Sequence, residues 1–386
     1  MSASRSKRCA WRGRISRMPR AALASVPMRY ARWAGALLLA VLAGCATQVP
    51  EEPTRGASVI RADLQRLLPA QVSDREGWAR DIAVAFTAQG LDSSRTNLCA
   101  VIAVTEQESS FRADPAVPGL PDIARREIQR RTQAMHVPTF LVNAALNLKS
   151  PTGKTYNQRL DAVRTERQLS EIFEDFIGMV PMGRQLFGGL NPVRTGGPMQ
   201  VSIAFAQAHA QDYPYEVDGS IRHEVFTRRG GMYFGIAHLL GYPARYDSVL
   251  YRFADFNAGW YASRNAAFQA AVSRLSGIEL ALDGDLLIRG SIDPSRTERA
   301  VRAIRRRLDI NEARIRPDLE KGDTLEFEST RLYRRVFELA DRDAGQRVPR
   351  AVLPGIKLSS PKITRNLTTA WFANRVHGRW KQCMAR

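Results

Sequence analysis

Two glutamates close an apolar stretch of the chain, AVIAVTEQESSF, which spans residues 100–111. At helical spacing Glu108 falls on the same face as Val101 and Val104, whereas Glu106 lies roughly 130° from the centre of that face. Burial disfavours a charged carboxylate, so we expect the pKa of Glu108 to be raised. A carboxyl group that stays protonated near neutral pH can donate a proton to a leaving oxygen. The pattern predicts Glu108 as a candidate general acid and Glu106 as a solvated or salt-bridged surface acid.

The helix alone leaves a second interpretation of Glu108. In this interpretation Glu108 is a buried carboxylate that pairs with an arginine such as Arg112 and has no catalytic role. Structural ion pairs bury acids just as active sites do. Residues elsewhere in the chain have to decide between the two.

Two later segments carry residues suited to holding a sugar. GGPMQVS spans residues 196–202, and its glycines let the backbone turn and come close to a ligand. FADFNAGWY spans residues 253–261. Its Asn-Ala-Gly break leaves backbone groups accessible, and its Trp-Tyr pair offers aromatic faces of the kind that stack on sugar rings. Each segment by itself is equally typical of an ordinary turn or of core packing.

In this order the three segments resemble the motifs of the lysozyme-like lytic transglycosylases, which have an SLT-type domain. The matching stretches are Glu108-Ser109, Gly197-Pro198-Met199-Gln200 and Phe256-Asn257-Ala258-Gly259. The resemblance covers residues 75–275, and the whole chain resembles an uncharacterised proteobacterial lipoprotein family built on this domain. It departs from the pattern at Pro198, where the family has Leu, at Phe256, where the family has Tyr, and in the long interval before the second motif.

The resemblance implies that Glu108 protonates the glycosidic oxygen between N-acetylmuramic acid and N-acetylglucosamine of peptidoglycan. The same carboxylate then deprotonates the muramyl 6-hydroxyl and gives a 1,6-anhydro product, so no second catalytic carboxylate is needed, unlike in the usual glycosidase pair. We interpret the nearest other acid, Asp255, as a helix-surface residue. Hydrolysis by water stays open, and a catalytically inactive peptidoglycan-binding protein is the alternative function. The residues expected to contact the glycan strand are Ser109, Met199, Gln200, Tyr233, Asn257, Ala258, Gly259, Trp260 and Tyr261.

The N-terminus has the form of a secretory signal. Residues 28–45, MRYARWAGALLLAVLAGC, give a short basic start, an apolar run too short for a good spanning helix, and a Leu-Ala-Gly-Cys ending. This ending resembles the bacterial lipobox, which implies lipidation of Cys45. Because Ala46 is not Asp, the resemblance implies anchoring to the periplasmic face of the outer membrane. An uncleaved signal anchor is the alternative, and residues 1–27 resemble an upstream extension.

The net charge of +19 is concentrated near the start, because residues 1–45 hold nine Lys/Arg and no Asp/Glu. The moderate basic excess in the rest of the chain suits an anionic partner such as a cell-wall polymer or lipid headgroups, or it is an Arg-rich background. We expect no nucleic-acid partner. We also expect no cofactor and no metal, because the five histidines form no H-E-x-x-H pattern and the cysteines form no CxxC pattern.

Two cysteines remain after the signal, Cys99 and Cys383. Export to an oxidising compartment favours a disulfide between them, and two buried free thiols are the alternative. The bridge would tie the C-terminal helix to the helix that carries Glu108.

Periodicity and capping signals predict a mainly α fold with a minor β element. We expect a tether over 46–58, a lysozyme-like helical domain over 59–275 with a helical insertion at about 117–195, and a C-terminal α/β extension over 276–386. Strands are predicted at 219–226 and, as a hairpin, at 278–290. Phe372, Val376 and Trp380 form a core-facing stripe on the last helix.

Overall fold

The computed structural model describes residues 55–357 and 367–386, which belong to one compact unit. The predicted signal over residues 1–45, its Cys45 and most of the predicted tether lie outside the described residues. The tether prediction runs two residues too far, because helix α2 begins at Ala57. None of the helices within the described ranges combines the length and the apolar character that crossing a membrane requires.

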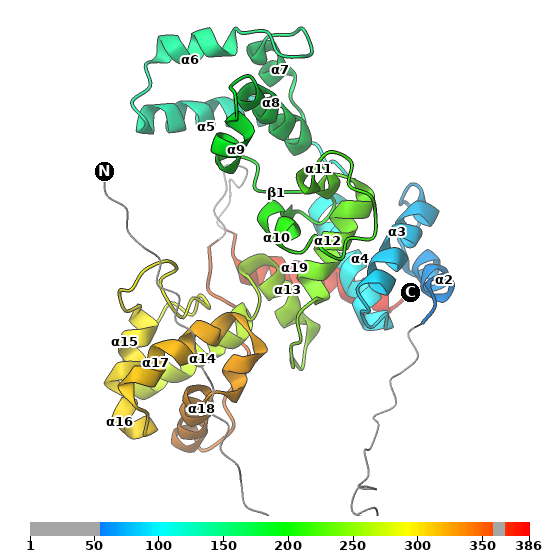
Figure 1. Ribbon diagram of the computed structural model, residues 1–386. Coiled ribbons are helices and arrows are strands. Elements are labelled where there is room, and N and C mark those ends of the chain that lie inside the picture. Colours follow the sequence, from blue (N-terminus) through cyan, green and yellow to red (C-terminus); the bar gives the residue numbers. More distant parts are fainter. Residues whose placement is uncertain (1–54, 358–366) are drawn as a thin grey trace, which may run out of the picture. The chain divides into compact units, whose positions relative to one another are not determined.

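The described chain is mainly helical, as predicted (Figure 1). The helices before the long insertion are α2 (Ala57–Leu67), α3 (Arg75–Ala88) and α4 (Arg95–Ser109). The insertion holds α5 (Leu120–Ala134), α6 (Thr139–Leu146), α7 (Tyr156–Ala162), α8 (Glu166–Gly178), α9 (Gly183–Phe187) and the 3-10 helix η1 (Gly188–Leu190). The central helices are α10 (Ile203–Ala208), α11 (Ile221–Val225), α12 (Arg228–Leu240) and α13 (Val249–Ala258).

The remaining helices follow Gly259. They are α14 (Ala262–Ser276), α15 (Arg296–Ala303), α16 (Arg305–Leu308), α17 (Glu312–Leu319), η2 (Glu320–Asp323), η3 (Leu325–Ser329), α18 (Arg331–Ala344) and α19 (Thr369–Met384).

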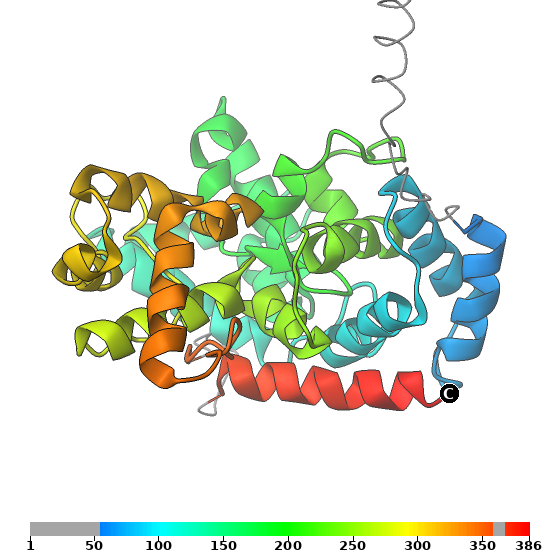
Figure 2. The same ribbon diagram turned by 90° about the horizontal axis from the view of Figure 1, so that it is seen from below.

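The first hydrophobic core joins parts of the chain that are far apart in sequence. It takes buried side chains from residues 60–111, 193–256 and 372–383. Figure 2 shows α19, drawn in red, at the C-terminal end of the chain, and its contacts are with α4 and α13. Phe372 and Val376 of its predicted stripe are buried in this core, and Trp380 packs against it. The C-terminal helix is therefore an integral part of the domain that contains Glu108.

The insertion has a small core of its own. Leu120, Tyr156 and Leu160 are among its buried residues, and they pack α5 against α7 and α8. Thr155 and Thr165 cap α7 and α8 with complete capping boxes, so local sequence starts both helices.

The boundary of the C-terminal extension differs from the prediction. Buried residues of α14, including Phe268 and Val272, belong to a second core with α15–α18. The first core contains nothing between Phe256 and Phe372 among its buried residues. The division falls at Gly259, before α14, and not at residue 275.

Both predicted strands are wrong. Residues 221–225 form α11, because the Ser220 side chain accepts a hydrogen bond from the His223 N–H and caps a helix there. Within 278–290 the structure has turns, because Gln269 takes the backbone groups that a hairpin would pair. Its amide donates to the Asp285 carbonyl at 3.1 Å and accepts from the Gly284 N–H at 2.8 Å.

The paired strands of the described residues are β1 (Thr195–Gly196) and β2 (Val201–Ser202), which are antiparallel.

Candidate active site

The last turn of α4 places Glu106 and Gln107 against α19. Arg379 donates to Glu106 Oε1 at 3.0 Å and to Gln107 Oε1 at 3.1 Å. Arg375 donates to the same Gln107 oxygen at 3.1 Å. Glu106 is thus salt-bridged, as predicted, although only 18% of its side chain is exposed.

Glu108 projects from a different side of the same turn, 200° from Glu106 at helical spacing, and it is half-buried. Helix α4 ends directly after it, because Ser110 and Phe111 both adopt left-handed backbone with φ of 51° and 59°. Phe111 is buried and packs edge-on against Trp78 at 5.3 Å between ring centroids. The buried aromatic residue thereby fixes the point at which the helix stops.

The residues around Glu108 connect this turn to α12. The Thr105 hydroxyl donates to the Val101 carbonyl at 2.9 Å and contacts Met232 Sδ of α12 at 3.8 Å. Ser109 is buried, and its hydroxyl donates to the Thr105 carbonyl at 3.1 Å. The proton of the Ser109 hydroxyl is therefore used within the helix, and the predicted contact of Ser109 with substrate stays a prediction.

The Gly-Pro-Met-Gln turn lies between β1 and β2 and rests on α12. A Cβ at Gly231 would come within 2.3 Å of Pro198, and one at Gly235 would come within 2.6 Å of Met199. These two glycines let the turn approach the helix closely. Met199 is fully buried in this contact, so its predicted role as a substrate contact is wrong.

Gln200, unlike Met199, is partly exposed to solvent. It is half-buried and adopts left-handed backbone with φ of 52°. Its amide donates to the Gly197 carbonyl and accepts from the Thr195 hydroxyl, both at 3.4 Å. These long bonds leave hydrogen-bonding capacity for a ligand.

The third motif ends α13 beside α19. Asn257 is exposed, and its side-chain oxygen accepts from the Thr369 hydroxyl at 3.0 Å. Ala258 and Gly259 are half-buried, and Gly259 has φ of 111° with open space around its Cβ position. Asn257, Ala258 and Gly259 thus remain accessible at the end of the helix.

Two of the predicted aromatic contacts belong to the core. Tyr233 is buried, and its hydroxyl donates to the Asp212 carbonyl at 2.8 Å. Tyr261 is buried as well, and its hydroxyl donates to the Pro243 carbonyl at 2.8 Å. Neither is available to a glycan, so both predictions are wrong.

Asp255 is fully buried, which contradicts its interpretation as a surface residue. Its carboxylate accepts from the Tyr242 and Tyr246 hydroxyls at 2.9 and 2.6 Å and from the Ser263 N–H at 2.7 Å. Burial raises the pKa of Asp255, and the hydrogen bonds partly offset that shift. The residue holds α13, the loop after α12 and the start of α14 together, and it is inaccessible as a second catalytic acid.

Asp255→Ala should lower the free energy of unfolding by about 3 kcal/mol, because it leaves three donors without their acceptor in a buried site. Urea denaturation monitored by far-UV circular dichroism measures the change. Asp247→Ala, at an exposed position beside the same helix, serves as the control and should stay within about 0.5 kcal/mol of the wild type. Equal free energies of unfolding for the two variants would contradict a role of Asp255 in holding these three segments together.

Trp260, a predicted glycan contact, lies in an aromatic cluster between α10 and the end of α13, and sequence reasoning missed its partners Phe205 and His209. Phe205 stacks on His209 with centroids 3.9 Å apart and meets Trp260 edge-on at 5.5 Å. Trp260 stacks on Tyr242 at 5.2 Å and donates to the His238 carbonyl at 2.7 Å. Phe205 and Trp260 are half-buried and His209 is exposed, so the cluster offers ring surface to solvent. The i, i+4 spacing of Phe205 and His209 directly after the glycine turn was the signal available in the sequence.

His238 lies beneath this cluster, with its Nε2 3.1 Å from the Phe256 carbonyl. Burial lowers the pKa of His238 from 6.5 to about 4. The folded state therefore binds this proton less readily than the unfolded chain, and stability is lost as the pH falls from 6.5 towards 4. Acidification from pH 7 to 4.5 should cost about 2 kcal/mol through this residue. His238→Gln lacks this titration. The free energy of unfolding of wild type minus that of the variant should therefore fall by about 2 kcal/mol between pH 7 and pH 4.5, as measured by urea titrations at each pH. An unchanged difference would contradict a neutral buried imidazole.

The three motifs meet through α12 and α19. Met232 of α12 contacts Thr105, one turn before Glu108, and lies between the glycines that receive the second motif. On α19, Thr369 reaches Asn257 and Arg375 reaches Gln107. The two α19 residues are six positions apart, roughly 9 Å of helix axis. Helices α12 and α19 thus connect the three segments that carry Glu108, Gln200 and Asn257.

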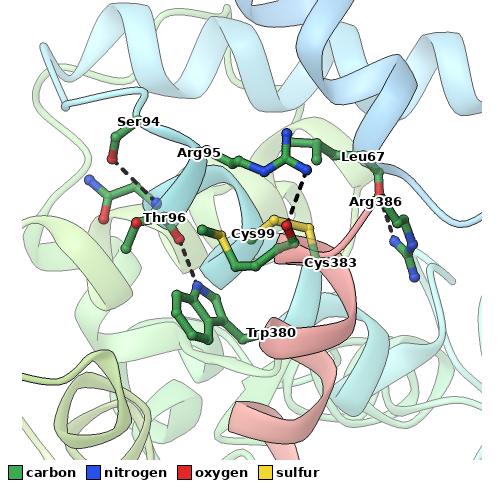
Figure 3. Close-up of a disulfide and its surroundings, with 10 residues drawn as sticks. Leu67, Ser94, Arg95, Thr96, Cys99, Trp380, Cys383 and Arg386 are labelled. Atoms are coloured by element: carbon green, nitrogen blue, oxygen red, sulfur yellow. Dashed lines mark hydrogen bonds between the residues drawn. A yellow bond between two sulfur atoms is a disulfide. The ribbon is translucent and has the colours of Figure 1, made fainter.

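The far end of α19 is fixed by the predicted disulfide between Cys99 and Cys383 (Figure 3). Hydrogen bonds surround it: Trp380 Nε1 donates to the Thr96 carbonyl at 3.1 Å, and Arg95 donates to the Met384 carbonyl at 3.2 Å. The bridge and these bonds set the position of α19 along α4.

Comparison with known proteins gives one family and one curated relative. The family model described as "Protein of unknown function (DUF1615)" matches residues 71–386. The chain is 57% identical over 350 residues to the uncharacterised protein YaiW of Escherichia coli strain K12, which covers 90% of this chain and 96% of the relative. No solved structure shows a significant match.

Proposed function

The chain belongs to the DUF1615 family of proteins of unknown function, and from its geometry we propose that it is a peptidoglycan lytic transglycosylase. The observation that carries the proposal is that three motif segments, which together span about 150 residues of chain, each pack against α12 or α19. An acid, an amide from a glycine turn and an amide from a broken helix end are the groups that the lysozyme-like lytic transglycosylases use.

Glu108 is the proposed general acid and base. It lies in the last turn of α4, where the carbonyl end of a helix disfavours negative charge, as suits a group that must hold a proton. It protonates the glycosidic oxygen between N-acetylmuramic acid and N-acetylglucosamine, so that the C1–O bond breaks with oxocarbenium character. It then takes the proton of the muramyl 6-hydroxyl as that oxygen bonds to C1.

Three further features support a single-acid mechanism on a sugar. Asp255, the nearest acid in the third motif, is buried and fully hydrogen-bonded. Gln200 and Asn257 offer amide groups for the hydroxyl and acetamido groups of the glycan. Trp260, with Phe205 and His209 beside it, supplies ring surface for stacking on a pyranose. We further propose that lipid on Cys45 tethers the enzyme to the periplasmic face of the outer membrane.

A peptidoglycan-binding protein without activity is the second candidate. The specific observation in its favour is that Asn257 already accepts a hydrogen bond from Thr369, while Phe256, which replaces the family's Tyr, is buried. Such a site would bind a glycan but would lack the full set of groups that the transglycosylase reaction needs.

Incubation of purified sacculi with the chain from Ala46 onward separates the two candidates. The enzyme should release soluble muropeptides at a rate proportional to its concentration. A protein that sediments with the sacculi and releases nothing, over a range of pH and salt, would instead be a binding protein.

A further inference from the structure

The insertion exposes an unusual amount of apolar surface. Ten of the fifteen exposed large hydrophobic side chains among the described residues lie between residues 135 and 190. Helix α6, with the sequence TFLVNAAL, has no buried residue. Large apolar patches on a protein surface mark interaction sites, so we expect this surface to bind a partner or a membrane.

Several of these side chains gather around the end of α5. Met135 follows α5 directly, and Phe140 and Leu141 lie in the first turn of α6 with 69% and 49% of their surfaces exposed. Arg131, in the last turn of α5, donates to the Leu190 carbonyl at 2.7 Å, which brings α9 and η1 alongside. We name as the apolar tip the side chains of Met135, Phe140, Leu141, Met182, Leu186 and Leu190, all of which are exposed. Figure 1 shows α5, α6 and α9, which carry or directly adjoin these residues.

The segment that carries Met135, Phe140 and Leu141 is basic. Residues 132–160 contain no Asp or Glu but include Lys149, Lys154 and Arg159. Lys149 and Lys154 are exposed, whereas Arg159 is paired with Asp175 and Arg130, before this stretch, with Glu127. Protein–protein interfaces carry aromatic and apolar residues within a polar rim that pairs groups of both kinds. Exposed apolar side chains on a segment whose exposed charges are lysines complement an anionic bilayer surface.

We infer that the apolar tip inserts into the interfacial region of a membrane that contains anionic lipid. Phe140, Leu141 and Met135 would enter the boundary between headgroups and acyl chains, while Lys149 and Lys154 would contact the headgroup phosphates. Membrane contact of this kind does not depend on the enzymatic activity. A lipid tether at Cys45 would strengthen it by holding the tip near a bilayer.

Vesicle flotation with the chain from Ala46 onward tests the inference without the lipid anchor, because residues 54–386 form one compact unit. The probes are vesicles of phosphatidylcholine alone and vesicles that also contain phosphatidylglycerol. The wild type should bind the anionic vesicles at least about tenfold more tightly than the neutral ones, and added salt should weaken the binding. Phe140→Ser combined with Leu141→Ser should lower that binding at least about tenfold, because two large apolar side chains are lost.

The matched control is Ile292→Ser, which removes a side chain that is 94% exposed in the C-terminal extension and should leave vesicle binding unchanged. A second readout uses thiol labelling, because Cys99 and Cys383 are bonded to each other and a new cysteine is the single reactive thiol after Ala46. An environment-sensitive dye on Phe140→Cys should shift to shorter wavelength with anionic vesicles, and on Ile292→Cys it should not.

Three outcomes would overturn the inference. They are absence of wild-type binding to anionic vesicles, equal binding by the Phe140 and Leu141 double variant, and an unshifted dye at position 140. Dimers in sedimentation velocity that the double variant abolishes, without vesicle binding, would assign the apolar tip to contact between protein chains instead.

Discussion

Glu108→Gln should lower the release of muropeptides from sacculi by at least about 100-fold, the usual contribution of a positioned general acid. Glutamine keeps the size of the side chain and its hydrogen-bonding capacity but cannot donate the proton that the leaving oxygen needs. The rate is measured as soluble muropeptide released per unit time at saturating sacculi. Binding to sacculi should persist, because the amides and rings that we propose to hold the glycan are untouched.

Glu106→Gln is the matched control, two residues away on the same turn. It removes the charge that pairs with Arg379 and should cost less than about 1 kcal/mol of stability. Its activity should remain within about twofold of wild type, because Glu106 faces α19 and has no proposed chemical role. Equal losses in the two variants would mean that the turn matters as structure, and the assignment of Glu108 would fail.

Loss of the disulfide should be the largest stability effect in the molecule. Cys99 and Cys383 are separated by 284 residues, so the bridge removes much of the entropy of the unfolded chain. The loop-entropy relation gives about 6 kcal/mol for a closure of this length, as an upper figure. Cys99→Ala with Cys383→Ala should unfold at a correspondingly lower urea concentration than wild type.

Reduction of the wild type supplies the control for that experiment, since it breaks the bond without changing the sequence. Reduced wild type and the double variant should unfold alike. Both should also lose part of their activity, because α19 carries Thr369 and Arg375, the residues that meet Asn257 and Gln107. Denaturation curves that coincide with that of oxidised wild type would contradict a stabilising role for the bridge.

Local patterns in the sequence predicted the helical phase around Glu106 correctly. The Ser94 cap and the apolar periodicity of α4 place Glu106 and Glu108 on different sides of one turn, and the contacts of Glu106 follow that phase. Such features depend on residues within a few positions of one another, so the sequence contains them directly.

Partners from distant segments could not be predicted in this way. Asp255 looks like a surface acid on its own helix, and only the fold brings Tyr242 and Tyr246 onto its carboxylate. Gln269 likewise replaces the hairpin predicted around Asp283 by taking its backbone groups from another helix. Met199 is a similar case, because the glycine against which it is buried, Gly235, lies on α12.

The most direct test of the central claim is the mass of the products released from sacculi by the chain from Ala46 onward. A lytic transglycosylase should give muropeptides that are one water lighter than the products of hydrolysis, with the 1,6-anhydro ring on muramic acid. Release of fully hydrated muropeptides would show lysozyme-type hydrolysis instead. Intact sacculi after prolonged incubation, with the protein folded and bound to them, would contradict an enzymatic function.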